Sequence, residues 1–96
     1  MKREYHKRYS SELGREMEMQ GLKGRYLSLT GRERQVMALV ASGKANKQVG
    51  SELGISEITV KAHRGQLMRK MRARSFADLV NMNAKLSLGV APKGQL

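Results

Sequence analysis

Positive charge is concentrated in one short stretch of the chain. Residues 58–74 contain Lys61, Arg64, Arg69, Lys70, Arg72 and Arg74 and no acidic residue. Lys and Arg side chains neutralise phosphates and can also donate hydrogen bonds to guanine O6 and N7. A run of charges is more often only a solvated surface. Because this run coincides with an expected helix, we interpret it as part of a nucleic-acid-binding element.

The residues around this stretch predict two short helices joined by a tight turn. The first helix is expected from Asn46 to Leu53, and the second is expected to begin after Ser56, a good N-cap, and to end near Met71 or Arg72. Gly54 suits the sharp turn between them because it has no Cβ. Such a helix-turn-helix places its second helix in the major groove of DNA.

The second helix is expected to have one buried and one exposed face. At about 100° per residue, Val60, Leu67 and Met71 fall on one side. Ile58, Lys61, Ala62, Gly65 and Arg69 fall on the opposite side. We expect the first set to pack in the core and the second set to face DNA.

Individual DNA contacts follow from side-chain chemistry. Lys61 can donate to guanine or to a phosphate, and the Ala62 methyl group can touch a thymine methyl group. Lys47 lies in the first turn of the first helix, which crosses the phosphates in this motif. Helix N-termini at Asn46 and Ser56 add N–H donors for phosphate. The predicted DNA-contacting residues are Asn46, Lys47, Ser56, Ile58, Thr59, Lys61, Ala62, His63, Gly65, Arg69 and Arg72.

Three residues of the second helix keep two interpretations each. Gly65 either allows close approach to the groove floor or is a weak point in the helix without a function. His63 is either a phosphate contact or a packing residue. Arg64 either pairs with Glu33 or stays in solvent.

The remaining chain supports this motif as an all-α, four-helix domain. Thr30 and Glu33 form a T-x-x-E capping box that starts a helix ending near Ser42. A cap-like Ser75 begins a last helix that ends near Asn83. We therefore expect a partly helical linker at 1–28, helical from about 11 to 26, a helix-turn-helix domain at 29–84 and a flexible tail at 85–96.

The composition limits the classes of function. The 96 residues carry 19 Lys and Arg against 8 Asp and Glu, a net charge of +11, which suits a polyanion. With 3 Tyr, 1 Phe and no Trp, the chain lacks the stacking platforms of single-strand binders, which favours duplex DNA. No Cys is present, and the histidines His6 and His63 have no metal partner at ligand spacing. We expect a cytoplasmic protein without a membrane span, a cofactor or an enzyme activity.

Residues 29–82 resemble the DNA-binding domain of LuxR/FixJ-type transcriptional regulators. The matching residues are L-T-x-R-E-x-x-V-M-x-L-V-A-x-G from Leu29, A-N-K-Q-V-G-x-x-L-G-I-S-x-x-T-V-K-x-H-R from Ala45, and L-M-x-K-M-x-A-R-S-x-A-D-L-V from Leu67. The FixJ-like response-regulator branch is the most similar. Gly65 departs from relatives that carry a longer, base-contacting side chain at this position.

The resemblance implies a LuxR/GerE-like domain that binds double-stranded, pseudo-palindromic promoter DNA as a homodimer. The last helix commonly forms the dimer contact in that family, which here assigns Leu79, Val80 and Met82 to it. In the response-regulator branch, an upstream receiver domain and a linker precede L-T-x-R-E, and residues 11–28 look like that linker. The chain is then either an excised effector domain or a naturally short regulator, with RNA polymerase as a further candidate partner.

Two other classes share parts of the pattern. Sigma-factor region 4-like domains also contain L-x-x-R-E followed by G-I-S-x-x-T-V-K, but the pair Asn46-Lys47 and His63 favour the LuxR/FixJ type. A basic RNA- or protein-interaction module could keep the helix-turn-helix only as a scaffold. It would be marked by stacking aromatics or an exposed apolar patch near the second helix, and the sequence shows neither.

Overall fold

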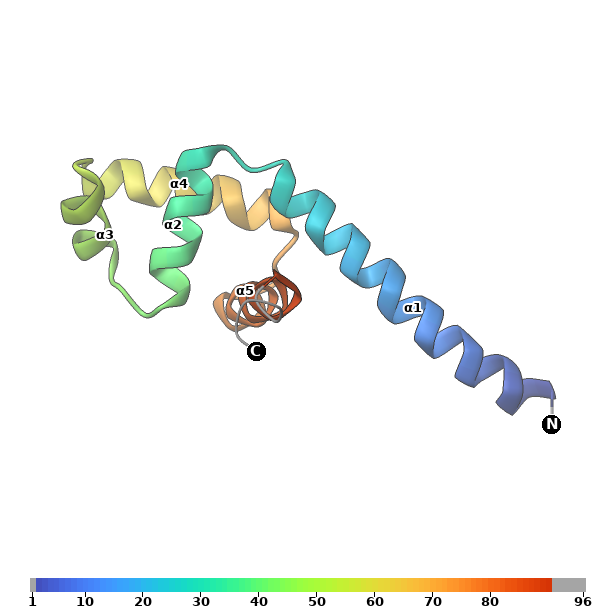
Figure 1. Cartoon of the computed structure of the whole chain (residues 1–96). Coiled ribbons are helices and arrows are strands. Elements are labelled where there is room, and N and C mark those ends of the chain that lie inside the picture. Colours follow the sequence, from blue (N-terminus) through green and yellow to red (C-terminus); the bar gives the residue numbers. More distant parts are fainter. Residues whose placement is uncertain (1, 91–96) are drawn as a thin grey trace.

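Five α-helices make up the part of the chain that the structure describes. The structure is a computed structural model that describes the backbone of residues 2–90 and the side chains of residues 12–87. The helices are α1 (Lys2–Leu27), α2 (Gly31–Ala41), α3 (Asn46–Leu53), α4 (Glu57–Met71) and α5 (Phe76–Val90), and no strand occurs among the described residues. Helices α2 to α5 gather into one body, from which α1 extends as a long rod (Figure 1). The expected all-α class is confirmed.

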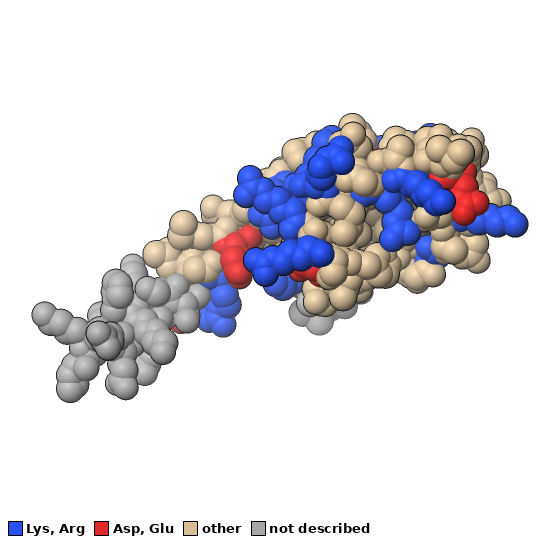
Figure 2. All heavy atoms as spheres, turned by 180° about the vertical axis from the view of Figure 1, so that it is seen from behind, with Lys and Arg blue, Asp and Glu red and all other residues tan. Residues whose placement is uncertain are grey.

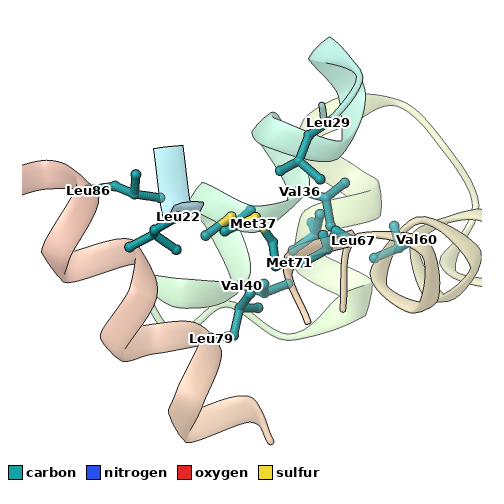
Figure 3. Packing of buried hydrophobic residues seen from close by; sticks show 11 residues of the cluster. Leu22, Leu29, Val36, Met37, Val40, Val60, Leu67, Met71, Leu79 and Leu86 are labelled. Atoms are coloured by element: carbon teal, nitrogen blue, oxygen red, sulfur yellow. The ribbon is translucent and has the colours of Figure 1, made fainter. Parts of the chain in front are cut away.

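Each helix contributes to one hydrophobic core. The buried side chains are Leu22 from α1, Leu29 before α2, Val36, Met37 and Val40 from α2, Val49 from α3, Val60, Leu67 and Met71 from α4, and Leu79 and Leu86 from α5. Side chains of α2 and α4 meet at the centre, while Leu22 and Leu86 lie together at one end (Figure 3). Because α4 is packed on both α2 and α3, its orientation is fixed by the core.

The start of α2 is held by the expected capping box. Thr30 Oγ1 accepts a hydrogen bond from the Glu33 N–H at 3.1 Å, and Glu33 Oε1 accepts one from the Thr30 N–H at 2.9 Å. Two N–H groups that a helix start leaves unpaired are thereby satisfied. The entry of the chain into α2 is therefore defined locally.

Two glycines allow the tight turn between α3 and α4. Gly54 has φ 70°, in the left-handed region where a Cβ is unfavourable. A Cβ added at Gly50 would lie 2.6 Å from Ile55 O, far inside van der Waals contact. Position 50 therefore requires a residue without a Cβ, because the closest atom belongs to the backbone of the turn.

Both ends of the folded unit extend further than expected. Helix α1 is continuous over Lys2–Leu27, and Leu22 is only 4% exposed, so the packed region begins upstream of residue 29. Arg25 Nε also donates to Met71 O at 2.9 Å, which ties α1 to the end of α4.

Helix α5 continues to Val90, and Leu86 is 7% exposed. The expectation of a flexible tail is therefore wrong for residues 85–90, while 91–96 lie outside the described residues. Leu22 lies between Gly21 and Gly24, which disfavour a helix, whereas Leu86 lies seven residues after Leu79 and falls on the same helix face.

Packing of α1 can be tested with one substitution. Leu22→Ala should lower the free energy of unfolding by about 2–4 kcal/mol, because it removes a buried side chain and leaves a cavity. Met17→Ala, on the same helix but 64% exposed, should change it by less than about 0.5 kcal/mol. Urea titration of the whole chain measures both. Equal effects of the two substitutions would show that α1 does not pack as described.

Candidate nucleic-acid interface

The first turn of α4 is stabilised by its own side chains. Ser56 Oγ accepts a hydrogen bond from the Thr59 N–H at 3.1 Å and lies 2.9 Å from Thr59 Oγ1. Ser56 is thus the N-cap, as expected. These contacts fix the start of α4 and leave its residues from Ile58 onward in a regular helix.

Helix α4 separates its residues into two faces as predicted. Val60, Leu67 and Met71 are fully buried. The exposed residues on the opposite side are Ile58, Lys61, Ala62, Gly65 and Arg69. Ile58 is apolar and 78% exposed. This exposed face contains both cations and short side chains and can therefore approach a polyanion closely.

The end of α4 extends this face by one residue. Arg72 caps the helix with φ 59°, the single non-glycine residue with positive φ among the described residues. The Ala73 N–H donates back to Met68 O at 3.0 Å, which satisfies a carbonyl at the helix end. The Arg72 side chain is exposed and also lines a groove between α1 and α5.

Helix α3 begins with an amide side chain that is hydrogen-bonded within the protein, and an exposed cation follows it. Lys47 is exposed in the first turn, as expected. Asn46 is half-buried, and its Oδ1 accepts a hydrogen bond from Arg64 Nη1 at 2.6 Å. The Asn46 side-chain oxygen is therefore engaged inside the protein, and what Asn46 can offer a phosphate is its N–H groups.

The two interpretations of Arg64 are both replaced by a third arrangement. Its guanidinium binds Asn46 and lies over the ring of Phe76, 5.4 Å from the centroid. Glu33 instead pairs with Lys70, whose Nζ lies 2.9 Å from Glu33 Oε1. Sequence reasoning considered the wrong cation of α4 for Glu33, because only the packing of α2 on α4 decides which cation reaches it.

Glu33 is a charged group inside the core. It is 4% exposed. Burial by itself would raise the pKa of Glu33, but the hydrogen bonds and charge of Lys70 and the bonds to Thr30 outweigh burial and hold that pKa below its ordinary value. Glu33 therefore stays ionised and links the start of α2 to α4.

Among the six cations of residues 58–74, exposure now distinguishes two groups. Lys70 and Arg64 are half-buried and bound to protein groups. Lys61, Arg69, Arg72 and Arg74 are exposed. Figure 2 shows Lys and Arg side chains spread over one side of the body with few acidic side chains among them. The exposed cations provide the surface that phosphates would meet.

His63 and Gly65 keep their predicted positions at the edge and the middle of that surface. His63 is half-buried, which leaves both of its interpretations open. A Cβ at Gly65 would meet no protein atom within 4 Å. The fold therefore does not require glycine at position 65, so any advantage of the missing side chain lies in what binds to α4.

The predicted dimer contacts need correction. Leu79 is fully buried within the same chain, so it is not available to a second copy. Val80 and Met82 are both half-buried, and Met82 lines the groove of about 580 Å³ between α1 and α5. The exposed positions of α5 include Ala77, Asn81 and Ala84. A helical wheel anchored on Leu79 and Leu86 would have located this outward face.

Comparison with known proteins identifies the family. Residues 27–83, more than half of the chain, match the sequence profile described as bacterial regulatory proteins, luxR family. The chain belongs to this family. Its helix-turn-helix is a luxR-family DNA-binding domain, and the resemblance inferred from the sequence is confirmed.

The similar proteins are mostly regulators of greater length. Nodulation protein W of Bradyrhizobium diazoefficiens is 55% identical over 67 residues, 70% of this chain and 30% of that protein. Response regulator protein TodT of Pseudomonas putida is 51% identical over 65 residues, 68% of this chain and 29% of that protein. The solved structure of response regulator StyR has a TM-score of 0.71 at 45% identity, covering 80% of this chain and 38% of StyR.

The luxR-family chain thus spans about 30% of the length of these curated relatives. Within the part of the chain that the structure describes, no helix combines the length and the apolar character needed to cross a membrane.

The buried carboxylate predicts acid sensitivity. Since the pKa of Glu33 is lower in the folded state, its stabilising effect is present above the ordinary glutamate pKa and is lost as pH falls through the folded value. The free energy of unfolding should therefore decrease on acidification, and Glu33→Gln should flatten this dependence while lowering stability at neutral pH. Urea titrations at several acidic pH values measure the free energy of unfolding of the unaltered chain and of the variant. Glu52→Gln, in the exposed pair with Lys44, is the control and should leave the profile nearly unchanged.

Gly65 can be tested independently of the fold. Gly65→Ala should raise the free energy of unfolding by about 0.5–1 kcal/mol, because alanine is the better helix former and the new methyl group meets no protein atom. Gly50→Ala, the contrasting variant, should lower it because of the clash with Ile55 O. Urea titration tests both signs. A more stable Gly65→Ala variant with weakened duplex binding would establish close approach at this position, and unchanged binding would exclude it.

Proposed function

We propose that the exposed face of α4 reads base edges in the major groove of promoter DNA while the start of α3 contacts the phosphates. The observation that carries this proposal is the exposed row of cations and short side chains on a helix whose other face is fully buried. A helix fixed in this way can enter a groove without rearrangement, and the luxR-family match favours this mode of binding.

Each exposed residue has a role that suits its chemistry. Lys61 and Ala62 lie on the part of α4 nearest its N-terminus, where recognition helices contact base edges. Lys47 is the proposed phosphate contact of α3, and Arg69 and Arg72 continue the contact along the backbone of the duplex. Thr59 and His63 flank the exposed face, where they would meet sugar and phosphate groups.

We further propose that the domain pairs on pseudo-palindromic DNA as the effector part of a two-component response regulator. TodT and StyR carry the name response regulator, and the chain matches only a minor part of each. In this proposal an upstream receiver domain acts through α1, which packs on α4 and α5. Val80 and Met82 are the members of the predicted dimer set that keep solvent-accessible surface for pairing.

The proposed setting is the cytoplasm, where promoter DNA and RNA polymerase are found, and the proposed role is binding without catalysis. The alternative of an RNA-binding module loses support because Phe76, the aromatic residue near α4, already has Arg64 over its ring. That contact occupies a ring face on which a base would stack.

Duplex binding should separate the roles of two lysines. An operator can first be selected from random duplex DNA by binding to the unaltered chain. Lys61→Ala should weaken binding to this operator by about 1–3 kcal/mol and binding to random duplex by much less, because a base contact is lost. Lys47→Ala should weaken both alike and reduce the slope of log affinity against log salt by about 0.9, because a phosphate contact is lost. Anisotropy titrations at several salt concentrations measure both quantities. Binding that does not depend on salt would contradict the proposed function, and identical behaviour of the two variants would demote Lys61 to a phosphate contact.

A further inference from the structure

One side chain connects three helices at the edge of the proposed interface. Arg64 is half-buried on the flank of α4, between its core face and its exposed face. Its Nη1 donates to Asn46 Oδ1 at 2.6 Å, and its guanidinium carbon lies 5.4 Å from the centroid of the Phe76 ring. Asn46 is the first residue of α3, and Phe76 is the first residue of α5.

This connection matters because the three helices are unequally packed on one another. Extensive contacts join α3 to α4, α2 to α4 and α2 to α5, but α5 has no comparable contact with α3 or α4. Helix α5 is therefore coupled to the helix-turn-helix through α2, through α1, which packs on both α4 and α5, and through Arg64.

The partners of Arg64 are both uncharged. The ion pairs among the described side chains are Lys44 with Glu52 and Lys70 with Glu33, and neither involves Arg64. The guanidinium is engaged inside the protein by the Asn46 amide oxygen and the face of the Phe76 ring. Its planar fork also permits donation toward Asn46 and stacking on Phe76 together, which the single ammonium of a lysine cannot reproduce.

We propose that Arg64 is a positioning residue that sets the start of α3 and the start of α5 relative to α4. By holding Asn46, it orients the first turn of α3, where Lys47 and the N–H groups would meet phosphate. By holding Phe76, it fixes the position of the start of α5 relative to that turn. This inference rests on the proposed interface, but it assigns Arg64 an action inside the protein and no direct contact with DNA.

Salt dependence distinguishes positioning from direct contact. Arg64→Ala should weaken binding of the whole chain to a half-site duplex about five- to tenfold, because an oriented charged hydrogen bond is lost. The slope of log affinity against log salt should stay unchanged, whereas Lys47→Ala should reduce it by about 0.9. Arg64→Lys should restore little affinity. A slope reduced by Arg64→Ala as much as by Lys47→Ala would show a phosphate contact and overturn the proposal.

A double-mutant cycle tests the two partners separately. Asn46→Ala should weaken half-site binding without changing the salt slope, and adding it to Arg64→Ala should cause no further loss, since both remove the same interaction. Phe76→Leu should behave in the same way. Additive losses, or unchanged affinity in both Asn46→Ala and Phe76→Leu, would overturn the proposal.

Circular dichroism checks that each variant is folded. If Arg64→Ala does not fold, Asn46→Ala and Phe76→Leu still decide the matter by their affinities and slopes. Failure of the unaltered chain to bind any duplex would instead refute the proposed function, so the two failures are distinguishable.

Discussion

Burial of one face of α4 is the constraint on which the rest of the structure depends. Val60, Leu67 and Met71 are fully buried, and they pack α4 on α2 and α3. Because side chains of a helix point outward at a fixed period, this burial determines which residues remain exposed. The same contacts that stabilise a small domain therefore also present Lys61, Ala62 and their neighbours to solvent.

Polar contacts add directed links between helices that also pack through hydrophobic side chains. Glu33 belongs to the capping box of α2 and also binds Lys70 of α4, so a local helix start and a tertiary contact share one carboxylate. Arg64 and Arg25 similarly join α4 to Asn46 and to α1. Hydrophobic contacts tolerate small shifts of one helix against another. Hydrogen bonds require particular atoms at particular distances and tolerate such shifts less. The bond from Arg64 to Asn46 thus adds a directed link between α4 and α3, and the other two link α4 to α2 and to α1.

Local sequence patterns were sufficient to predict the helix starts and the turn that neighbouring residues determine. The capping box at Thr30, the turn at Gly54 and the N-cap at Ser56 each follow from neighbouring residues, and each is present. Packing between distant segments was not predictable in this way. Leu22 lies between two glycines that disfavour a helix, and Arg64 could not be assigned because its partners lie in α3 and α5. Leu79 was misassigned because an apolar residue on a terminal helix suits a core or an interface equally well.

The central claim is that the exposed face of α4, together with the start of α3, meets duplex DNA. It is tested most directly by following backbone amide resonances of the chain during titration with a half-site duplex. The account predicts that the largest shifts occur at Lys47, Lys61, Ala62, Gly65 and Arg69. Shifts centred instead on the groove between α1 and α5, at Met19, Met82 and Lys85, with α4 unaffected, would contradict it.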